Sequence, residues 1–201
     1  MTIAVTGPFA SGKSTLVRLL GELPDTETAS ADEMVHYLLK DDPQAISRVV
    51  ERFGEGVRGT DGIDRKALGR EVFGDAEALR DLEEILHPLV RDETNRRIEA
   101  SDDEMFVVEI PLLFETGRGE DFDYTVAVTV PEERRHAWSG ERGVDEAALE
   151  AIESRQLTGE EKAERADLVV QNDGDLDRLR EQAEGIGRNI LRERGSDGGL
   201  R

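Results

Sequence analysis

The sequence predicts an α/β fold, in which a parallel sheet lies between two layers of helices. Short apolar runs alternate with helical segments, which is the order that parallel strands with helical crossovers require. The first run, residues 2–6, ends directly at a glycine-bounded loop. A charged block from about residue 43 to residue 100 is helical throughout, so we expect it to be an insertion between two strands.

Apolar runs and turn residues set the expected order of the elements. Strands are expected at residues 2–6, 27–31, 105–110, 124–130 and 168–170. Helices are expected at residues 15–20, 32–39, 132–166 and 175–192, with further short helices inside the charged block. Within that block we expect Pro88 to end one helix and open the next, because proline fits best in the first turn of a helix.

Composition limits the classes of protein to which the chain can belong. Its 201 residues, 37% of them hydrophobic, suffice for one compact domain with a core. No run of about 18 apolar residues occurs, so we expect no membrane span. The first residues lack the pattern of a signal peptide, which predicts a cytoplasmic protein. Cysteine is absent, which excludes disulfides and thiolate metal sites.

The formal net charge of -20 allows two interpretations. The acidic residues alternate with apolar positions, as they would on an ordinary solvated surface. They would also suit a high-salt cytoplasm, where screening weakens the mutual repulsion of like charges. Under both interpretations we expect no nucleic-acid partner, because binding a polyphosphate backbone needs a basic surface.

The segment from Gly7 to Ser14, Gly-Pro-Phe-Ala-Ser-Gly-Lys-Ser, fits the phosphate-binding pattern G-x-x-x-x-G-K-S/T. Glycines let the backbone wrap around a phosphate and point N–H groups at it, and the following helix adds positive potential. In this pattern the lysine, Lys13, reaches the β- and γ-phosphates, and the Ser14 hydroxyl binds magnesium. A glycine-rich turn that binds nothing is disfavoured, because a predicted strand precedes the segment and a predicted helix follows it.

The phosphate-binding loop alone does not distinguish a kinase from a GTPase or a motor ATPase. The guanine-reading pattern Asn-Lys-x-Asp is absent, and no apolar run ends in an Asp-Glu pair. Small size, a helical insertion and an arginine-bearing late segment favour a kinase that phosphorylates a small-molecule hydroxyl. A kinase for another nucleoside or nucleotide and a non-enzymatic nucleotide switch stay open as alternatives.

Asp32 follows the second predicted strand, at the edge of the sheet where open α/β folds bind ligands. A carboxylate at this edge can orient an acceptor hydroxyl and take its proton late in phosphoryl transfer. Aspartate before a helix is equally a preferred N-cap. The sequence leaves both interpretations open.

Further segments occur in the order typical of one family, and with the loop they make the chain resemble the dephospho-CoA kinases over residues 1 to about 180. These segments are Ser30-Ala-Asp32, Phe53-Gly54, residues 62–69, Val72-Phe73, residues 85–90, residues 111–115, Gln156 with Lys162, Ala166-Asp167 and Asn172-Asp-Gly174. The resemblance implies ATP-dependent phosphorylation of the ribose 3′-hydroxyl of dephospho-CoA, the last step of coenzyme A synthesis. It also implies a three-layer P-loop kinase fold over residues 1–201, with an inserted helical acceptor-binding subdomain at about 33–103 and a helical lid at about 139–165.

The resemblance also assigns roles to individual residues. The implied ATP-binding residues are Ala10, Ser11, Gly12, Lys13, Ser14, Thr15 and Asn172, with Ser14 as the Mg²⁺ ligand. Asp32 matches the catalytic base, and Arg142 matches a lid arginine that acts in catalysis with Lys13. Arg65 and His87 fall in the acceptor-binding part. The implied small-molecule partners are ATP and dephospho-CoA, and protein partners are not indicated.

The chain departs from the family pattern at three places. Ser30 stands where the family usually has aspartate, and Pro8 to Ala10 replace its usual Gly-Ile-Gly. A lid position that is usually arginine is Ile152, with Arg155 nearby but out of register.

Structural interpretations stay open for five residues. His87 could cap a helix break, Arg65 could pair with Asp61 or Asp64, Arg142 could be surface charge, and Glu115 could close a turn. For Trp138, packing is favoured over stacking on a base.

The acidic composition generates the first testable prediction. If the charge reflects a high-salt cytoplasm, the melting temperature should rise from dilute buffer to molar potassium chloride, because screening removes repulsion among carboxylates. Thermal unfolding followed by circular dichroism at several salt concentrations measures this rise. A flat or falling curve would leave only the ordinary acidic surface.

Overall fold

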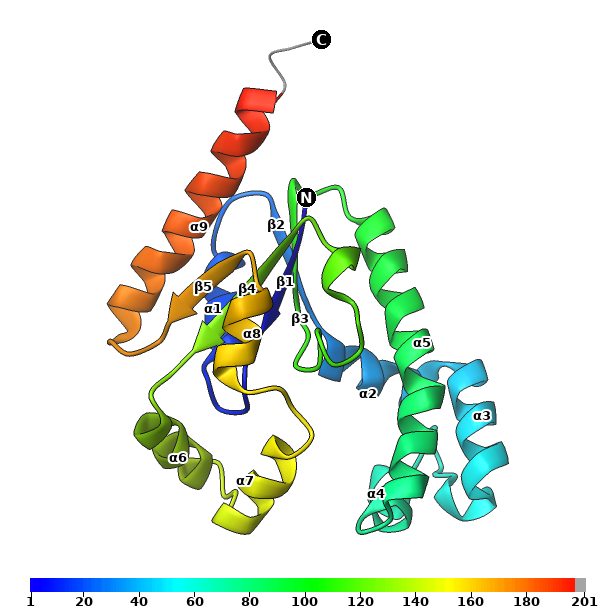
Figure 1. The fold of residues 1–201 in the computed structure, drawn as a ribbon. Helices are drawn as coiled ribbons and strands as arrows, with labels where there is room; N and C mark the ends of the chain where they lie inside the picture. The colour runs from blue at the N-terminus through cyan, green and yellow to red at the C-terminus, as the bar shows by residue number, and fades with distance from the viewer. Residues whose placement is uncertain (198–201) are drawn as a thin grey trace. The chain divides into compact units, whose positions relative to one another are not determined.

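A computed structural model describes residues 1–197, and it contains one five-stranded sheet with the order β2-β3-β1-β4-β5 (Figure 1). The strands are β1 (Thr2–Thr6), β2 (Thr26–Ser30), β3 (Met105–Glu109), β4 (Tyr124–Thr129) and β5 (Leu168–Gln171). Strand β1 pairs in parallel with β3 and with β4, and β4 pairs in parallel with β5. The predicted α/β fold with a parallel sheet is confirmed.

Strand β1 lies at the centre of this sheet, and its residues 3–6 are all buried. Val5 is in register with Glu109 on one side and with Val126 on the other. A strand that is paired along both edges and covered on both faces needs a continuous apolar run, as the sequence has here. The loop that follows β1 therefore starts from a fixed point in the sheet.

Helices cover both faces of the sheet (Figure 1). Helix α1 (Lys13–Leu20) packs against β1, β3 and α9 (Leu176–Asp197) on one face, while α8 (Gly159–Arg165) packs on β4 on the other. Helices α6 (Glu132–Glu141) and α7 (Glu146–Glu153) lie beyond the carboxyl ends of β4 and β5, and a short 3-10 helix, η2, spans Gly119–Asp121.

The chain divides into two compact units, one of residues 1–29 and 102–201 and one of residues 30–101. The second unit is helical, with α2 (Ala31–Asp41), α3 (Pro43–Phe53), the 3-10 helix η1 (Glu55–Val57), α4 (Arg65–Val72) and α5 (Ala76–Ala100). It has a hydrophobic core of its own, made of Leu39, Val49, Val50, Val57, Ile63, Leu68 and Leu86.

Helix α5 runs through Pro88 without a break, so the expectation of two helices there was wrong. An interior proline removes a backbone hydrogen bond and costs about 3 kcal/mol. Leu86 and Leu89, on either side of the proline, are both buried, and burying each leucine contributes roughly 1.5–3 kcal/mol. Packing on both sides of Pro88 therefore holds the helix together across it.

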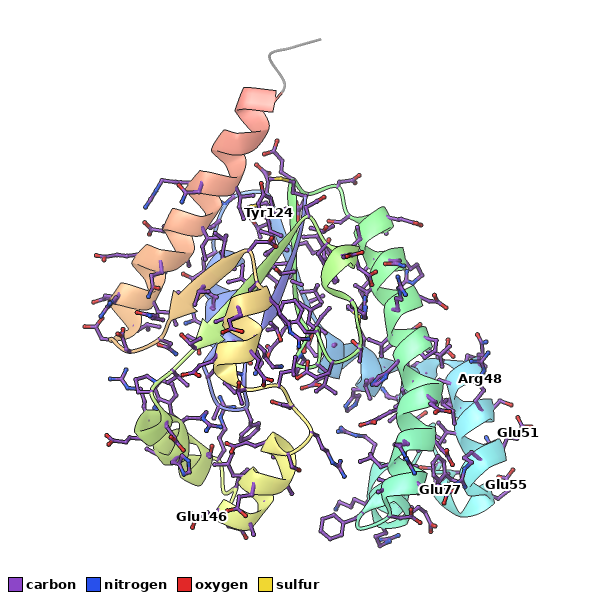
Figure 2. The ribbon with its side chains drawn as sticks, in the orientation of Figure 1. Arg48, Glu51, Glu55, Glu77, Tyr124 and Glu146 are labelled. Atoms are coloured by element: carbon purple, nitrogen blue, oxygen red, sulfur yellow. The ribbon has the colours of Figure 1, made fainter. Side chains whose placement is uncertain are left out.

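Charged side chains point outward from the helical unit (Figure 2). Arg48 and Glu51 on α3, Glu55 on η1 and Glu77 on α5 are all exposed. Within the part of the chain that the structure describes, no helix is both long and apolar enough to cross a bilayer.

Glu93 is the exception on α5, because its carboxylate is only 7% exposed. Arg96 donates to it twice, at 2.7 and 2.8 Å, and Arg97 Nε donates at 2.7 Å. The hydrogen bonds from Arg96 are the main reason that the pKa of Glu93 falls from 4.5 to about 2, and those from Arg97 add to them against the effect of burial.

This lowered pKa predicts an acid-sensitive contribution to stability. Because the folded-state pKa lies below the unfolded one, the contribution is complete above about pH 4.5 and is lost as the pH falls toward 2. Glu93→Gln should therefore lower the free energy of unfolding at pH 7 by up to about 3 kcal/mol, with a smaller difference at pH 3. Urea unfolding at several pH values measures both effects.

The matched control is Glu99→Gln, an exposed carboxylate on the same helix, which should change little. Wild-type and Glu93→Gln curves that stay parallel from pH 7 to pH 3 would contradict the predicted linkage.

Candidate functional site

The loop between β1 and α1 has the backbone shape of a phosphate cradle. Its residues Gly7, Ala10 and Gly12 all have positive φ, at 150°, 57° and 93°. A Cβ atom on Gly12 would lie 2.2 Å from the side-chain nitrogen of Asn172, so only glycine fits there. Gly12 is therefore required for two reasons: its backbone is left-handed, and Asn172 packs closely against it.

Asn172 connects this loop to the end of β5. Its side-chain Nδ2 donates to the Ser11 carbonyl at 2.9 Å, and its backbone N–H donates to Thr129 at 2.8 Å. Asn172 is buried, so the bond is protected from water. Asn172, which the resemblance assigns to ATP binding, therefore supports the backbone of the phosphate loop and does not project into solvent.

The start of α1 is suited to an anion. Its N-cap residue is Gly12, so no side chain caps the first N–H groups of the helix. The Ser11 hydroxyl is buried and has no hydrogen-bond partner among the described residues. Uncapped N–H groups and the positive end of the helix dipole favour a bound phosphate.

Lys13 lies across the loop rather than out in solvent. It is 7% exposed, and its Nζ donates to the Pro8 carbonyl at 2.9 Å. A phosphate in the loop would offer this ammonium a charged acceptor, which makes a stronger hydrogen bond than a neutral carbonyl. Ser14, on the first turn of α1, is exposed and accessible to a metal ion.

A cavity of about 440 Å³ adjoins the loop within the same unit. It is lined by Gly12, Thr15, Trp138, Glu141, Arg142, Asn172, Gly174, Asp175, Leu176 and Leu179. The Arg142 guanidinium lies 5.8 Å from the ring centroid of Phe9, a loop residue. Arg142 is exposed and lies over the ring of a loop residue, and its lid role stays a prediction.

A second cavity, of about 470 Å³, lies in the helical unit. It is lined by Asp32, Glu33, His36, Tyr37, Lys40, Asp41 and Arg65. Helix α2 has Ser30 as its N-cap and begins at Ala31, so Asp32 is in the first turn and the N-cap interpretation was wrong. The structure thus brings together Asp32 and Arg65, which are 33 positions apart in the sequence.

Arg65 reaches this cavity because the segment before it docks on the end of α2. The Ile63 N–H donates to the Leu39 carbonyl at 2.8 Å, and a Cβ on Gly62 would lie 2.5 Å from the Lys40 carbonyl oxygen. The Asp64 side chain caps α4, whose first residue is Arg65. Arg65 Nη1 lies 3.0 Å from His36 Nδ1, rather than paired with Asp61 or Asp64.

Two other predicted residues are not brought to these cavities. His87 is half-buried in the middle of α5 and is not among the side chains that line the cavity with Asp32. Because α5 does not break at Pro88, His87 does not cap a helix break. Arg155, which is out of register with the family's lid position, is exposed and lines neither cavity. The acceptor role of His87 stays a prediction.

A buried ion pair joins the segment after β3 to helix α8. Lys162 is fully buried, and its Nζ lies 2.8 Å from Glu115 Oε1 and also donates to the Pro111 carbonyl. The same carboxylate oxygen accepts the Leu157 N–H at 2.8 Å. Burial lowers the pKa of Lys162, and the hydrogen bond and charge of Glu115 oppose that shift. Glu115 does more than close a turn, because it bonds both α8 and the segment between α7 and α8.

Glu109 is a site candidate that sequence reasoning missed. It is the last residue of β3, in register with Val5 and therefore close to the start of the phosphate loop. P-loop enzymes place a magnesium-associated carboxylate at such a strand end. The sequence signal is the apolar run Met-Phe-Val-Val before a single glutamate, which differs from the Asp-Glu pair expected of a motor ATPase.

Comparison with known proteins shows the family. A sequence model of the dephospho-CoA kinases matches residues 1–178. The chain belongs to the dephospho-CoA kinase family. A dephospho-CoA kinase from Symbiobacterium thermophilum is 39% identical over an alignment of 202 positions that covers 98% of this chain and 83% of that protein. The predicted family, and with it the assignment as an ATP-using kinase, is confirmed.

Solved structures share the fold. A crystal structure from Thermus thermophilus superposes with a TM-score of 0.79 at 31% identity, covering 94% of this chain and 97% of the other. Dephospho-CoA kinase from Campylobacter jejuni superposes with a TM-score of 0.65 at 26% identity, covering 94% and 96% of the two chains.

The position of Lys13 generates a prediction. Positioning and charge neutralisation supply most of the catalysis in phosphoryl transfer, so Lys13→Ala should lower turnover by about 100-fold or more while the fold survives. Steady-state turnover and urea unfolding of the purified variant measure the two effects. Arg188→Ala, which removes an exposed cation from α9, is the control and should leave turnover unchanged. Near-normal turnover in folded Lys13→Ala would exclude the loop as the catalytic phosphate site.

Proposed function

We propose that this chain transfers the terminal phosphoryl group of ATP to the ribose 3′-hydroxyl of dephospho-CoA, with Asp32 as the residue that receives the hydroxyl proton. Family membership supports the reaction. The observation that supports the acceptor site is the cavity of the helical unit, where Asp32 and Arg65 meet. A carboxylate beside cationic side chains suits a ligand that carries both a hydroxyl and phosphates.

Lys13, the loop N–H groups and Arg142 hold the donor in this proposal. The net charge of -20 repels a polyanion, so local positive groups must outweigh the overall field. Lys13 and the start of α1 supply positive charge and dipole at the β- and γ-phosphates. Arg142 stabilises the charge that develops on the transferring group.

Magnesium fits the residues at the loop. Ser14 offers an exposed hydroxyl on the first turn of α1, and Glu109 offers a carboxylate at the end of the neighbouring strand β3. Hydroxyl and carboxylate oxygens are the ligands that Mg²⁺ prefers, with water and phosphate completing its shell. The ion would neutralise charge on the β- and γ-phosphates, while Lys13 and the loop position them.

Asp32 orients the acceptor hydroxyl and accepts its proton late. Phosphoryl transfer has a loose transition state, so an ordinary carboxylate need not remove the proton early. Arg65 and Lys40 are the cations of the same cavity and would pair with the acceptor's diphosphate. His87 would contact the acceptor from α5, although it does not line this cavity.

The remaining assignments follow the family pattern. Residues of about 33–103 form the acceptor-binding subdomain, and residues of about 139–165 form a lid that carries Arg142. We further propose a cytoplasmic enzyme without nucleic-acid partners, since its surface is acidic, and a high-salt cytoplasm as the origin of that charge.

Substitution of Asp32 tests the proposal. Asp32→Asn keeps the size and hydrogen bonding of the side chain but loses its charge. Because the amide cannot act as a general base, turnover should fall at least about tenfold. Affinity for ATP and the melting temperature should change little. Glu33→Gln is the matched control, because Glu33 is another exposed carboxylate in the first turn of α2 and lines the same cavity.

The acceptor is identified by screening candidate substrates with mass detection of the product. The proposal expects CoA from dephospho-CoA, with phosphate on the 3′-oxygen. Equal activity of Asp32→Asn and wild type would remove Asp32 from the mechanism. Phosphorylation of a nucleoside monophosphate, with dephospho-CoA untouched, would show another acceptor class.

A further inference from the structure

We propose that Trp138 is the surface on which the base of the donor nucleotide stacks. The inference rests on the proposed ATP site at the phosphate loop. It assigns a donor-binding role to a residue that the sequence alone favoured as a packing residue.

The position of Trp138 supports this role. It lines the cavity of about 440 Å³ together with Gly12 of the phosphate loop and Thr15 of α1, and it is half-buried rather than enclosed in the core. Because this cavity adjoins the loop, the proposal places the base of a loop-bound nucleotide in it. An indole is the largest flat apolar surface that a protein can offer to a base.

Arg134 holds the indole in place. Its guanidinium carbon lies 5.6 Å from the centroid of the Trp138 ring, and its Nη1 donates to the Gly174 carbonyl. Gly174 belongs to the segment after β5 that also lines the cavity. Arg134 therefore fastens α6 to this segment, with Trp138 oriented between them, which reduces the entropy that stacking would otherwise cost.

Apolar side chains complete the cavity. Leu179 is buried, whereas Leu176 is 48% exposed, one of the few large apolar side chains left open to solvent in the described part of the chain. A planar base lying against Trp138 would cover part of this exposed surface. Burial of apolar area on both sides of the ring favours binding of the base.

Stacking tolerates any base because every base has a π-face. We therefore expect both ATP and GTP to contact Trp138.

The experiment uses the fluorescence of Trp138, the only tryptophan in the chain. The wild-type protein is titrated, without acceptor, with the magnesium complexes of ATP, GTP and inorganic tripolyphosphate. ATP and GTP should each change the tryptophan emission. Tripolyphosphate should bind by calorimetry without the emission change, because it fills the loop but has no base.

Substitution separates stacking from packing. Trp138→Leu should weaken ATP and GTP binding by about tenfold or more, the range expected for base stacking, and leave tripolyphosphate affinity unchanged. Trp138→Phe keeps an aromatic face and should recover most of the ATP affinity. In turnover, the loss should appear in KM for ATP with little change in kcat.

Two outcomes would overturn the inference. One is ATP binding by calorimetry with unchanged tryptophan emission. The other is an equal loss of ATP and tripolyphosphate affinity in Trp138→Leu and Trp138→Phe, which would mark a structural role. If neither ATP nor tripolyphosphate binds the wild type, the donor site in the proposed function fails as well, which distinguishes that failure from a failure of Trp138 alone.

Discussion

The parallel pairing of β1 on both of its edges is the constraint on which the nucleotide-binding unit depends. Because β3 and β4 fix β1 from either side, the loop after it begins at a defined point and direction. Strand β5, which pairs with β4, is followed directly by Asn172, whose side-chain amide donates to the Ser11 carbonyl. Strand β1 thus fixes the start of the phosphate loop, and Asn172 fixes its middle. The loop has this support without a bound ligand.

Local chemistry explains what the sequence could predict. The strand, loop and helix around Lys13 follow from adjacent residues, and so do the α/β fold and the family. The predictions for Pro88 and Asp32 were wrong because they also relied on adjacent residues alone. Pro88 is a helix breaker only where packing cannot compensate, and here buried leucines flank it. The N-cap of α2 is Ser30 rather than Asp32, although the helix begins within one residue of its expected start.

Contacts between distant segments could not be predicted in the same way. Arg65 meets the cavity of Asp32 because Gly62 fits closely against the end of α2, and nothing in the periodicity shows that fit. Glu115 and Lys162 are 47 positions apart, and only the fold makes them partners. Trp138 illustrates a different limit, since a single aromatic residue in a polar helix gives no sign of whether it faces a core or a cavity.

The distribution of side-chain amines has a practical consequence. Of the four lysines, Lys13 and Lys162 are buried in the nucleotide-binding unit, whereas Lys40 and Lys66 are exposed in the helical unit. Amine-reactive dyes, cross-linkers and biotin reagents would therefore modify lysine side chains of the helical unit only. A protein attached to a surface through these lysines would keep its phosphate loop chemically intact, while Lys40, beside Asp32, would report directly on occupancy of the neighbouring cavity by its protection from labelling.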